Sequence, residues 1–141
     1  MKLTSPNFKH NEKIPIRFTG DGENINPNLF IEEIPKNAKS LVLIVDDPDA
    51  PAGTWIHWIV FNIKTTNRIK ENSIPGIQGK NTYGKIDYLG PKPPSSTHRY
   101  FFRIYALDSF LNLRERCSRE DLEEAMKGHV LDKSELIGIY R

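Results

Sequence analysis

The 141-residue sequence contains a single cysteine, no long apolar run and no excess of charge of either sign. Cys117 has no partner for an intramolecular disulfide, which is typical of proteins in a reducing compartment. The longest apolar candidate, Trp55–Phe61, is interrupted by His57 and is far shorter than the roughly 18 residues of a membrane-spanning helix. The first residues also lack the apolar core of a signal peptide. We therefore expect a cytoplasmic protein without stable membrane insertion.

The charge balance bears on the class of partner. Lysine and arginine number 20 and aspartate and glutamate 18, so the formal net charge is only +2. A dedicated nucleic-acid-binding protein normally carries a strongly basic stripe, so we expect no nucleic-acid partner. The chain is long enough to bury a core, and neither an internal repeat nor a linker divides it. The sequence predicts a single domain over residues 1–141.

Three segments have the apolar patterns of β-strands. Ser40–Val45 is almost continuously apolar, as expected of a strand that is buried on both faces. Trp55–Ile63 alternates, and strict alternation places His57 on the same face as Ile59. Arg99–Leu107 alternates as well. Together with glycine and proline punctuation, these segments predict a mostly antiparallel β protein.

Two weaker strand candidates lie near the ends of the chain, at Ile14–Phe18 and Leu136–Tyr140. Only one helix is indicated. Ser118 is a suitable N-cap residue, Asp121 follows three positions later, and Gly128 is suited to end the helix. Acidic residues in a first helical turn are ordinary helix chemistry, so we interpret the cluster Glu120, Asp121, Glu123 and Glu124 as a solvated face rather than a metal site.

The segment Lys64–Ser96 is long, polar and rich in glycine and proline, with no clear period. A segment of this length inside a compact domain is usually functional or disordered. Its tyrosines and the rigid Gly90–Pro94 stretch favour an ordered loop that covers part of the domain.

Polar side chains cluster at the ends of the predicted strands. Asp47 follows the first strand and His57 lies near the start of the next, so antiparallel pairing would bring both to one sheet edge. If the third strand runs parallel to the second, it brings His98 to the same edge. The resulting pocket mouth would hold Asp47, Asp49, His57, His98, Arg99 and Tyr100.

Each of these residues also has a purely structural interpretation. A histidine on an apolar strand face is more often a satisfied structural residue than a functional one. Asp47 and Asp49 are suited to cap the turn through bonds to the backbone, and Arg99 to pair with a carboxylate. The coincidence of titratable groups at three strand ends, each beside aromatic or proline side chains, favours a functional pocket.

The segments that carry these residues resemble a known family. Asp47–Pro51, the pair His57-Trp58, Gly90–Pro94 and His98–Tyr100, in this order, are similar to motifs of the phosphatidylethanolamine-binding protein family. Within that family, the sequence resembles the short bacterial and archaeal Raf-kinase-inhibitor-like members. The resemblance covers nearly the whole chain, with departures such as Ile31, where a tryptophan is usual.

The resemblance implies a β-sandwich of two antiparallel sheets with one or two peripheral helices. It also implies a small pocket that binds the phosphate of a phospholipid head group or of a phosphorylated residue, with no cofactor and no metal. The pocket residues carried over to this sequence are Asp47, Asp49, His57, Gly90, Pro94, His98 and Tyr100. The family pattern further suggests a cis peptide bond between Ala50 and Pro51.

For this pocket we expect the two aspartates to accept hydrogen bonds from His57 and from backbone N–H groups, and so to orient the imidazole. An adjacent carboxylate would also favour protonated histidine and strengthen anion binding. The histidines and Tyr100 would then donate to phosphate oxygens, with the affinity falling as the pH rises.

Two other functions remain open. Hydrolysis by His and Asp is disfavoured, because no serine is marked as a nucleophile and no short metal-ligand spacing occurs, so we expect a protein that is not an enzyme. Some relatives inhibit serine proteases or kinases through surface loops. Here the corresponding surface would be the basic loop residues Lys64, Arg68, Lys70, Lys80 and Lys85.

Overall fold

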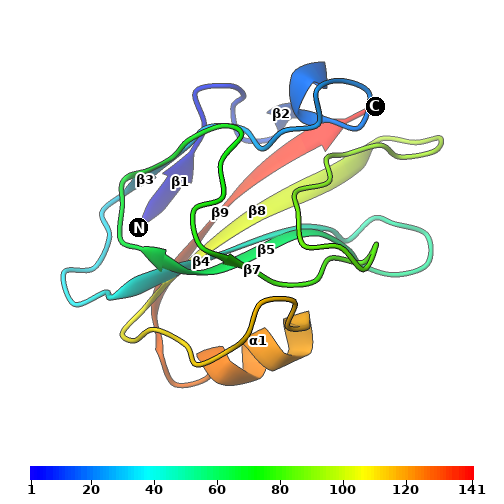
Figure 1. Ribbon diagram of the computed structural model, residues 1–141. Helices are drawn as coiled ribbons and strands as arrows, with labels where there is room; N and C mark the ends of the chain where they lie inside the picture. Colours follow the sequence, from blue (N-terminus) through cyan, green and yellow to red (C-terminus); the bar gives the residue numbers. More distant parts are fainter.

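The computed structural model describes residues 1–141 as two packed β-sheets with one α-helix on the outside (Figure 1). The larger sheet contains, in spatial order, β2 (Glu12–Lys13), β9 (Val130–Tyr140), β8 (His98–Leu107), β4 (Ser40–Asp47), β5 (Trp55–Lys64) and β7 (Ile77–Gln78). The smaller sheet contains β1 (Lys2–Thr4), β3 (Leu29–Glu32) and β6 (Arg68–Ile69). The mostly β, two-sheet prediction is confirmed. One detail is wrong, because β2 pairs with β9 in parallel and the larger sheet is therefore not wholly antiparallel.

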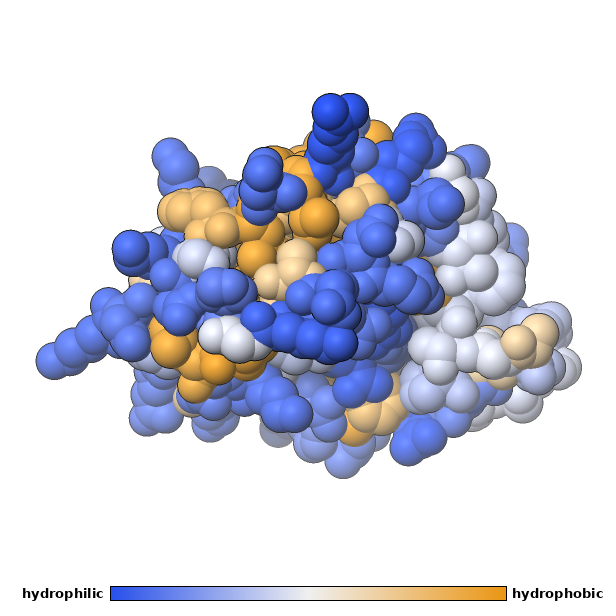
Figure 2. All heavy atoms as spheres, turned by 90° about the horizontal axis from the view of Figure 1, so that it is seen from below, coloured by the Kyte–Doolittle hydropathy of each residue, from blue (hydrophilic) through white to orange (hydrophobic).

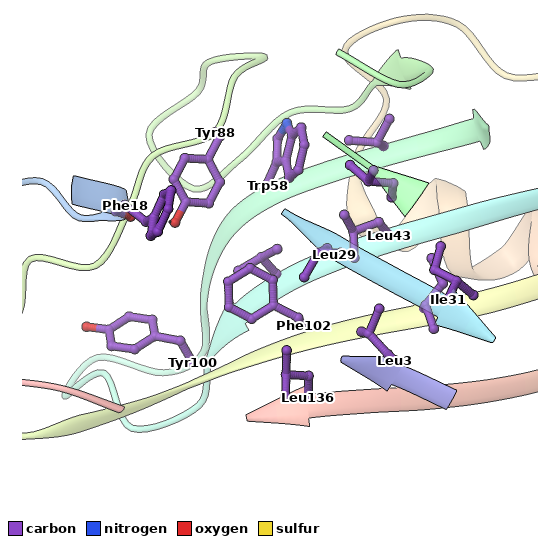
Figure 3. Packing of buried hydrophobic residues seen from close by; sticks show 14 of the residues in the cluster. Leu3, Phe18, Leu29, Ile31, Leu43, Trp58, Tyr88, Tyr100, Phe102 and Leu136 are labelled. Carbon is purple, nitrogen blue, oxygen red and sulfur yellow. The ribbon is translucent and has the colours of Figure 1, made fainter. Parts of the chain in front are cut away.

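Strand β4 lies in the middle of the protein and is buried over its whole length. Leu41, Leu43 and Val45 join the core between the two sheets, part of which is shown in Figure 3. Val42 and Ile44 point the other way, into a second apolar cluster that is covered by the helix α1 (Arg119–Met126). Burial on both faces explains the continuous apolar run of this strand, as predicted.

Strand β5 departs from strict alternation at two irregularities in its pairing with β4. One lies at His57, because Val45 pairs with Trp58 but Asp46 pairs with Ile56, which leaves His57 as the extra residue of a bulge. A bulge re-aims the side chains around it. The predicted placement of His57 with Ile59 is therefore wrong: Ile59 joins the helix-side cluster, whereas the His57 ring lies against Tyr100, which belongs to the core between the sheets.

The weaker strand predictions have mixed outcomes. Ile14–Phe18 is not a strand: residues Ile16–Phe18 form a short 3₁₀ helix that follows Pro15. The fixed φ of proline and its missing N–H favour such a turn over continued sheet pairing. At the other end, the strand predicted for Leu136–Tyr140 is confirmed and begins earlier, at Val130. Its first half is polar and partly exposed, so the pattern of apolar residues did not indicate that the strand begins there.

The predicted helix is confirmed together with its cap. Ser118 accepts a hydrogen bond from the backbone N–H of Asp121 at 3.1 Å, and Gly128 just beyond the helix has a positive φ of 79°. The acidic side chains of this helix are exposed, and Figure 2 shows the face that carries it as mostly hydrophilic with small separate apolar groups. The acidic side chains of the helix therefore form a solvated face, as expected. No helix has the length and apolar character that crossing a membrane requires.

The segment Lys64–Ser96 is an ordered covering loop, as predicted, with β6 and β7 inside it. Backbone hydrogen bonds join it to β5: Gly79 N–H donates to the carbonyl of Ile59, and Leu89 N–H donates to the carbonyl of His57. The loop is thereby held across the end of β5 that carries the candidate site.

Candidate functional site

The topology of the larger sheet brings the two candidate histidines to one end of it. β5 and β8 both pair antiparallel with β4, so they run parallel to each other on either side of it. The C-terminal end of β4, at Asp47, therefore meets the beginnings of β5 and β8. A cavity of about 220 Å³ opens at this point, and His57 and His98 both line it. We call it the histidine pocket.

Within the pocket, His98 and Asp47 form a buried pair. The Nδ1 atom of His98 lies 2.6 Å from Oδ2 of Asp47, although 51 positions separate the two residues in sequence. The second carboxylate oxygen of Asp47 accepts from the backbone N–H of Asp49 at 2.8 Å. Because a carboxylate accepts, Nδ1 of His98 carries the hydrogen and Nε2 is the ring nitrogen left without a partner.

His57 is oriented by a different group from the one predicted. Its Nδ1 atom donates to the backbone carbonyl of Leu89, and neither aspartate accepts from it. Burial lowers the pKa of His57 below its ordinary value, an effect that the Leu89 carbonyl and the charge of Asp47 only partly offset. The charge of Asp47 does favour protonated His57, as expected, but burial outweighs this effect and the pKa of His57 is lowered overall. The loop carbonyl replaces the predicted aspartate because the bulge turns the ring toward the loop.

Asp49 lies outside the pocket lining and faces Arg99. Its carboxylate accepts from the Arg99 backbone N–H and, through both oxygens, from the guanidinium at 2.8 and 2.9 Å. These hydrogen bonds lower the pKa of Asp49 to about 2. Asp49 thus holds the start of β8 against the turn after β4, and the structural interpretation of Arg99 as a partner of a carboxylate is confirmed.

Of the three remaining predicted residues, two line the pocket and one does not. Tyr100 and Pro94 line the pocket, and burial raises the pKa of Tyr100, so that its hydroxyl keeps its proton. Gly90 does not line it. A Cβ atom at Gly90 would lie 2.4 Å from the carbonyl oxygen of Phe18, so glycine is required there by close backbone packing. The peptide bond between Ala50 and Pro51, for which the family pattern suggests a cis form, is trans, because the chain contains no cis peptide bond.

Sequence reasoning missed six pocket residues: Trp55, Tyr83 and Lys92, which carry polar groups, and Ala50, Pro51 and Pro93, which do not. Trp55 pairs with Asp47 across β4 and β5, and its indole Nε1 is buried without a hydrogen-bond partner. Tyr83 packs edge-on against Trp55 at 5.0 Å between ring centroids. Lys92, inside the Gly90–Pro94 motif, adds the only side chain of the lining that is positively charged at neutral pH whatever the state of the histidines. Its position between the motif's prolines was a signal that could have identified it.

The pocket offers donors at the ammonium group of Lys92 and at the tyrosine hydroxyls, and also at Nε2 of each imidazole when the ring is protonated. The lining holds an ammonium group, two imidazoles and tyrosine hydroxyls, but no serine, threonine or cysteine. No group of three or more His, Cys, Asp or Glu side chains in the protein is arranged to hold a metal ion. A small cavity with these groups suits a compact ligand rich in hydrogen-bond acceptors.

Comparisons with known proteins identify the family of this chain. The family model described as phosphatidylethanolamine-binding protein matches residues 4–141. A UPF0098 protein of Methanothermobacter thermautotrophicus is 48% identical over 149 residues, which cover 100% of this chain and 99% of the relative. A UPF0098 protein of Chlamydia muridarum is 46% identical over 147 residues, covering 99% and 98% of the two chains.

Two solved structures are similar over nearly the whole chain. CT736 of Chlamydia trachomatis, described as a phosphatidylethanolamine-binding protein homologue, superposes with a TM-score of 0.96 at 44% identity and covers 99% of this chain and 96% of its own. YbcL of Escherichia coli, described as a new member of the mammalian family, gives 0.90 at 25% identity, with 99% and 97% covered. This chain therefore belongs to the phosphatidylethanolamine-binding protein family.

Proposed function

We propose that the protein binds small phosphate-bearing anions in the histidine pocket. The observation that carries the proposal is the convergence of His57 and His98 on one cavity, each held through Nδ1 by a fixed acceptor. The phosphate group of a phospholipid head group or of a phosphorylated residue presents the oxygen acceptors that such a pocket requires. The family membership supports the same ligand class.

The hydrogen bonds to the ring nitrogens determine how an anion would be held. Because both Nδ1 atoms already donate, only Nε2 of each ring faces a ligand, and in neutral imidazole that atom is an acceptor. A fully ionised oxygen is therefore bound by an imidazolium ring, or by the ammonium group of Lys92 and the hydroxyl of Tyr100, which line the same pocket. Anion binding and protonation of the histidines should thus favour each other.

We propose binding without turnover. The support is the composition of the lining, in which no serine, threonine or cysteine lies next to the histidines. The Ser95–Thr97 stretch before His98 contributes nothing to the lining. Inhibition of a protease or kinase stays a prediction. The five basic loop residues expected to form that surface, Lys64, Arg68, Lys70, Lys80 and Lys85, are exposed, but a merely solvated loop would show the same. The cytoplasmic location also stays a prediction.

Calorimetric titration with sodium sulfate and with phosphate, at pH 5.5 and pH 8, tests the proposal. Sulfate keeps its charge over this range whereas phosphate itself titrates, so sulfate isolates the contribution of the histidines. We expect sulfate to bind at least about tenfold more weakly at pH 8, or about 1.4 kcal/mol. His98→Gln should reduce that pH dependence to the part that His57 contributes.

A matched control is available elsewhere in the chain. His129 also pairs with an aspartate, Asp108, at 2.7 Å, but lies outside the pocket. His129→Gln should leave sulfate binding unchanged. Equal sulfate affinity at both pH values, or an equal loss in the two histidine variants, would contradict the proposed site.

A further inference from the structure

A second cavity is lined by other residues of the covering loop. Its volume of about 550 Å³ exceeds that of the histidine pocket and falls within the roughly 300–1,000 Å³ of small-molecule sites. Three segments far apart in sequence form its walls, namely residues 24–26, 72–74 and 86–88, and Trp58 and Gln78 complete it. We call this cavity the amide cleft, because four of its lining residues are asparagine or glutamine.

Gln78 presents an unpaired donor to this cleft. Its side-chain oxygen accepts from the indole Nε1 of Trp58 at 2.7 Å, and an indole N–H can only donate. The orientation of the amide is thereby determined, with the Nε2 group on the opposite side. Gln78 is only 7% exposed, and no group of the protein accepts from Nε2. The Nε2 group is not enclosed by the protein, so a ligand or solvent in the cleft can accept from it.

Asn24 adds a second amide donor. Its Oδ1 atom accepts from the backbone N–H of Gly90 at 2.6 Å, so its Nδ2 group is left free of protein partners. Asp87 supplies an acceptor to the same lining, since its carboxylate forms no ion pair and receives only one long hydrogen bond, from Asn81 at 3.4 Å. The cleft thus offers both donors and an acceptor.

The walls of the cleft are held in place by the protein itself. Asn26 is buried and bridges two positions of the covering loop: it donates to the Lys70 carbonyl at 2.9 Å and accepts from the Ser73 N–H at 3.0 Å. Tyr88 donates to the Phe18 carbonyl at 2.6 Å and packs edge-on against Trp58 (Figure 3). The open groups of the cleft are therefore presented by a fixed frame, which reduces the entropy lost when a ligand binds.

The charge of the lining excludes the ligand class of the histidine pocket. No lysine, arginine or histidine lines the amide cleft, whereas Asp87 does, so an anion would meet only a negative charge. The apolar part of the lining comes from Ile25, Ile74 and Ile86 together with the aromatic rings. A complementary ligand carries both donors and acceptors, has apolar C–H surface and is not negatively charged.

We propose that the amide cleft binds an uncharged sugar of mono- or disaccharide size. Each hydroxyl of a sugar both donates and accepts, so adjacent hydroxyls can accept from Gln78 and Asn24 while one donates to Asp87. The C–H face of a sugar ring suits the isoleucine and aromatic side chains. This site is independent of the anion site, since the two cavities share no lining residue.

NMR titration of ¹⁵N-labelled protein with D-glucose and with maltose tests the proposal. The side-chain amide signals of Gln78 and Asn24 should shift with at least one of the two sugars. Gln78→Glu retains an acceptor for the indole N–H of Trp58 but removes the amide donor. We expect this variant to lose at least tenfold in sugar affinity while its sulfate affinity is unchanged.

His98→Gln serves as the reciprocal control, because it should leave the sugar titration unchanged. Failure of the sulfate experiment with a positive sugar titration would remove only the anion site. The sugar site is overturned if neither sugar shifts the two amide signals, or if Gln78→Glu binds sugar as the native chain does. If adenosine shifts these signals while neither sugar does, the cleft binds a different class of ligand and the sugar proposal is likewise overturned.

Discussion

The histidine pocket and the amide cleft are formed by neighbouring residues of one loop and yet have opposite character. Leu89 contributes its carbonyl to His57, while Tyr88, the residue before it, lines the cleft and bonds to Phe18. The pocket is small and carries groups that hold or gain positive charge, whereas the cleft is larger and carries amides and one carboxylate. A loop with no regular period can thus separate two environments, because each of its residues is held by a different partner.

The aromatic residues that line the two cavities range from fully buried to half-exposed, and this range gives the largest expected effect. Trp58 is 1% exposed and belongs to the core, whereas Tyr83 at the rim of the histidine pocket is 51% exposed. We expect Trp58→Ala to lower the free energy of unfolding by about 3–5 kcal/mol, and Tyr83→Ala by less than about 1 kcal/mol. Urea denaturation of both variants measures the difference. Similar losses would show that the cleft is no more firmly joined to the core than the rim of the pocket.

Asparagine variants of two carboxylates, one in each cavity, test whether the two cavities bind different ligands. Asp47 accepts from His98, whereas Asp87 forms no ion pair. Hydrogen bonds to charged groups contribute about 1.5–3 kcal/mol, so Asp47→Asn should weaken sulfate binding at pH 5.5 by roughly 10- to 100-fold. Asp87→Asn should leave sulfate affinity within twofold, as calorimetry would measure. A loss of sulfate affinity in the Asp87 variant would mean that the two cavities are not independent.

The smallest effect concerns the protonation of His57. Burial lowers its pKa, so the unfolded chain binds this proton more readily than the folded one. The neutral ring thus contributes stability that is present above the ordinary histidine pKa of about 6.5 and is lost as the pH falls through the lowered folded-state value. NMR should show His57 titrating below 6.5 in the free protein and at higher pH in sulfate. An unchanged pKa in sulfate would place the anion away from this ring.

Much of the fold could be predicted because burial acts on residues that are close in sequence. The run Ser40–Val45, the alternation of Arg99–Leu107 and the cap at Ser118 are local patterns, and each appears where it was expected. The short strands could not be predicted in this way. β2, β6 and β7 have two residues each, too few for a period, and form only because a longer strand supplies their pairing partner.

The candidate site, like the fold, could be predicted only in part from the sequence. The motifs identified His57, His98 and Asp47, and the direction of the strands was sufficient to bring them together. Which acceptor holds which ring was assigned wrongly, because a one-residue bulge at His57 is a property of the pairing with β4 and leaves no mark in the alternation. Lys92 was overlooked because its role depends on how the proline-rich turn folds back over the pocket.

Local sequence patterns were sufficient to predict the β architecture, the helix with its cap, and the set of polar residues at one end of the larger sheet. The pairing of Asp47 with His98, the hold of a loop carbonyl on His57 and the position of Asp49 beside Arg99 became evident only from the folded chain. It alone assembled the amide cleft, whose walls come from three distant segments. The physical reason is that periodicity records which face of a strand is buried, whereas hydrogen-bond partners depend on strand register and loop closure between residues far apart in the chain.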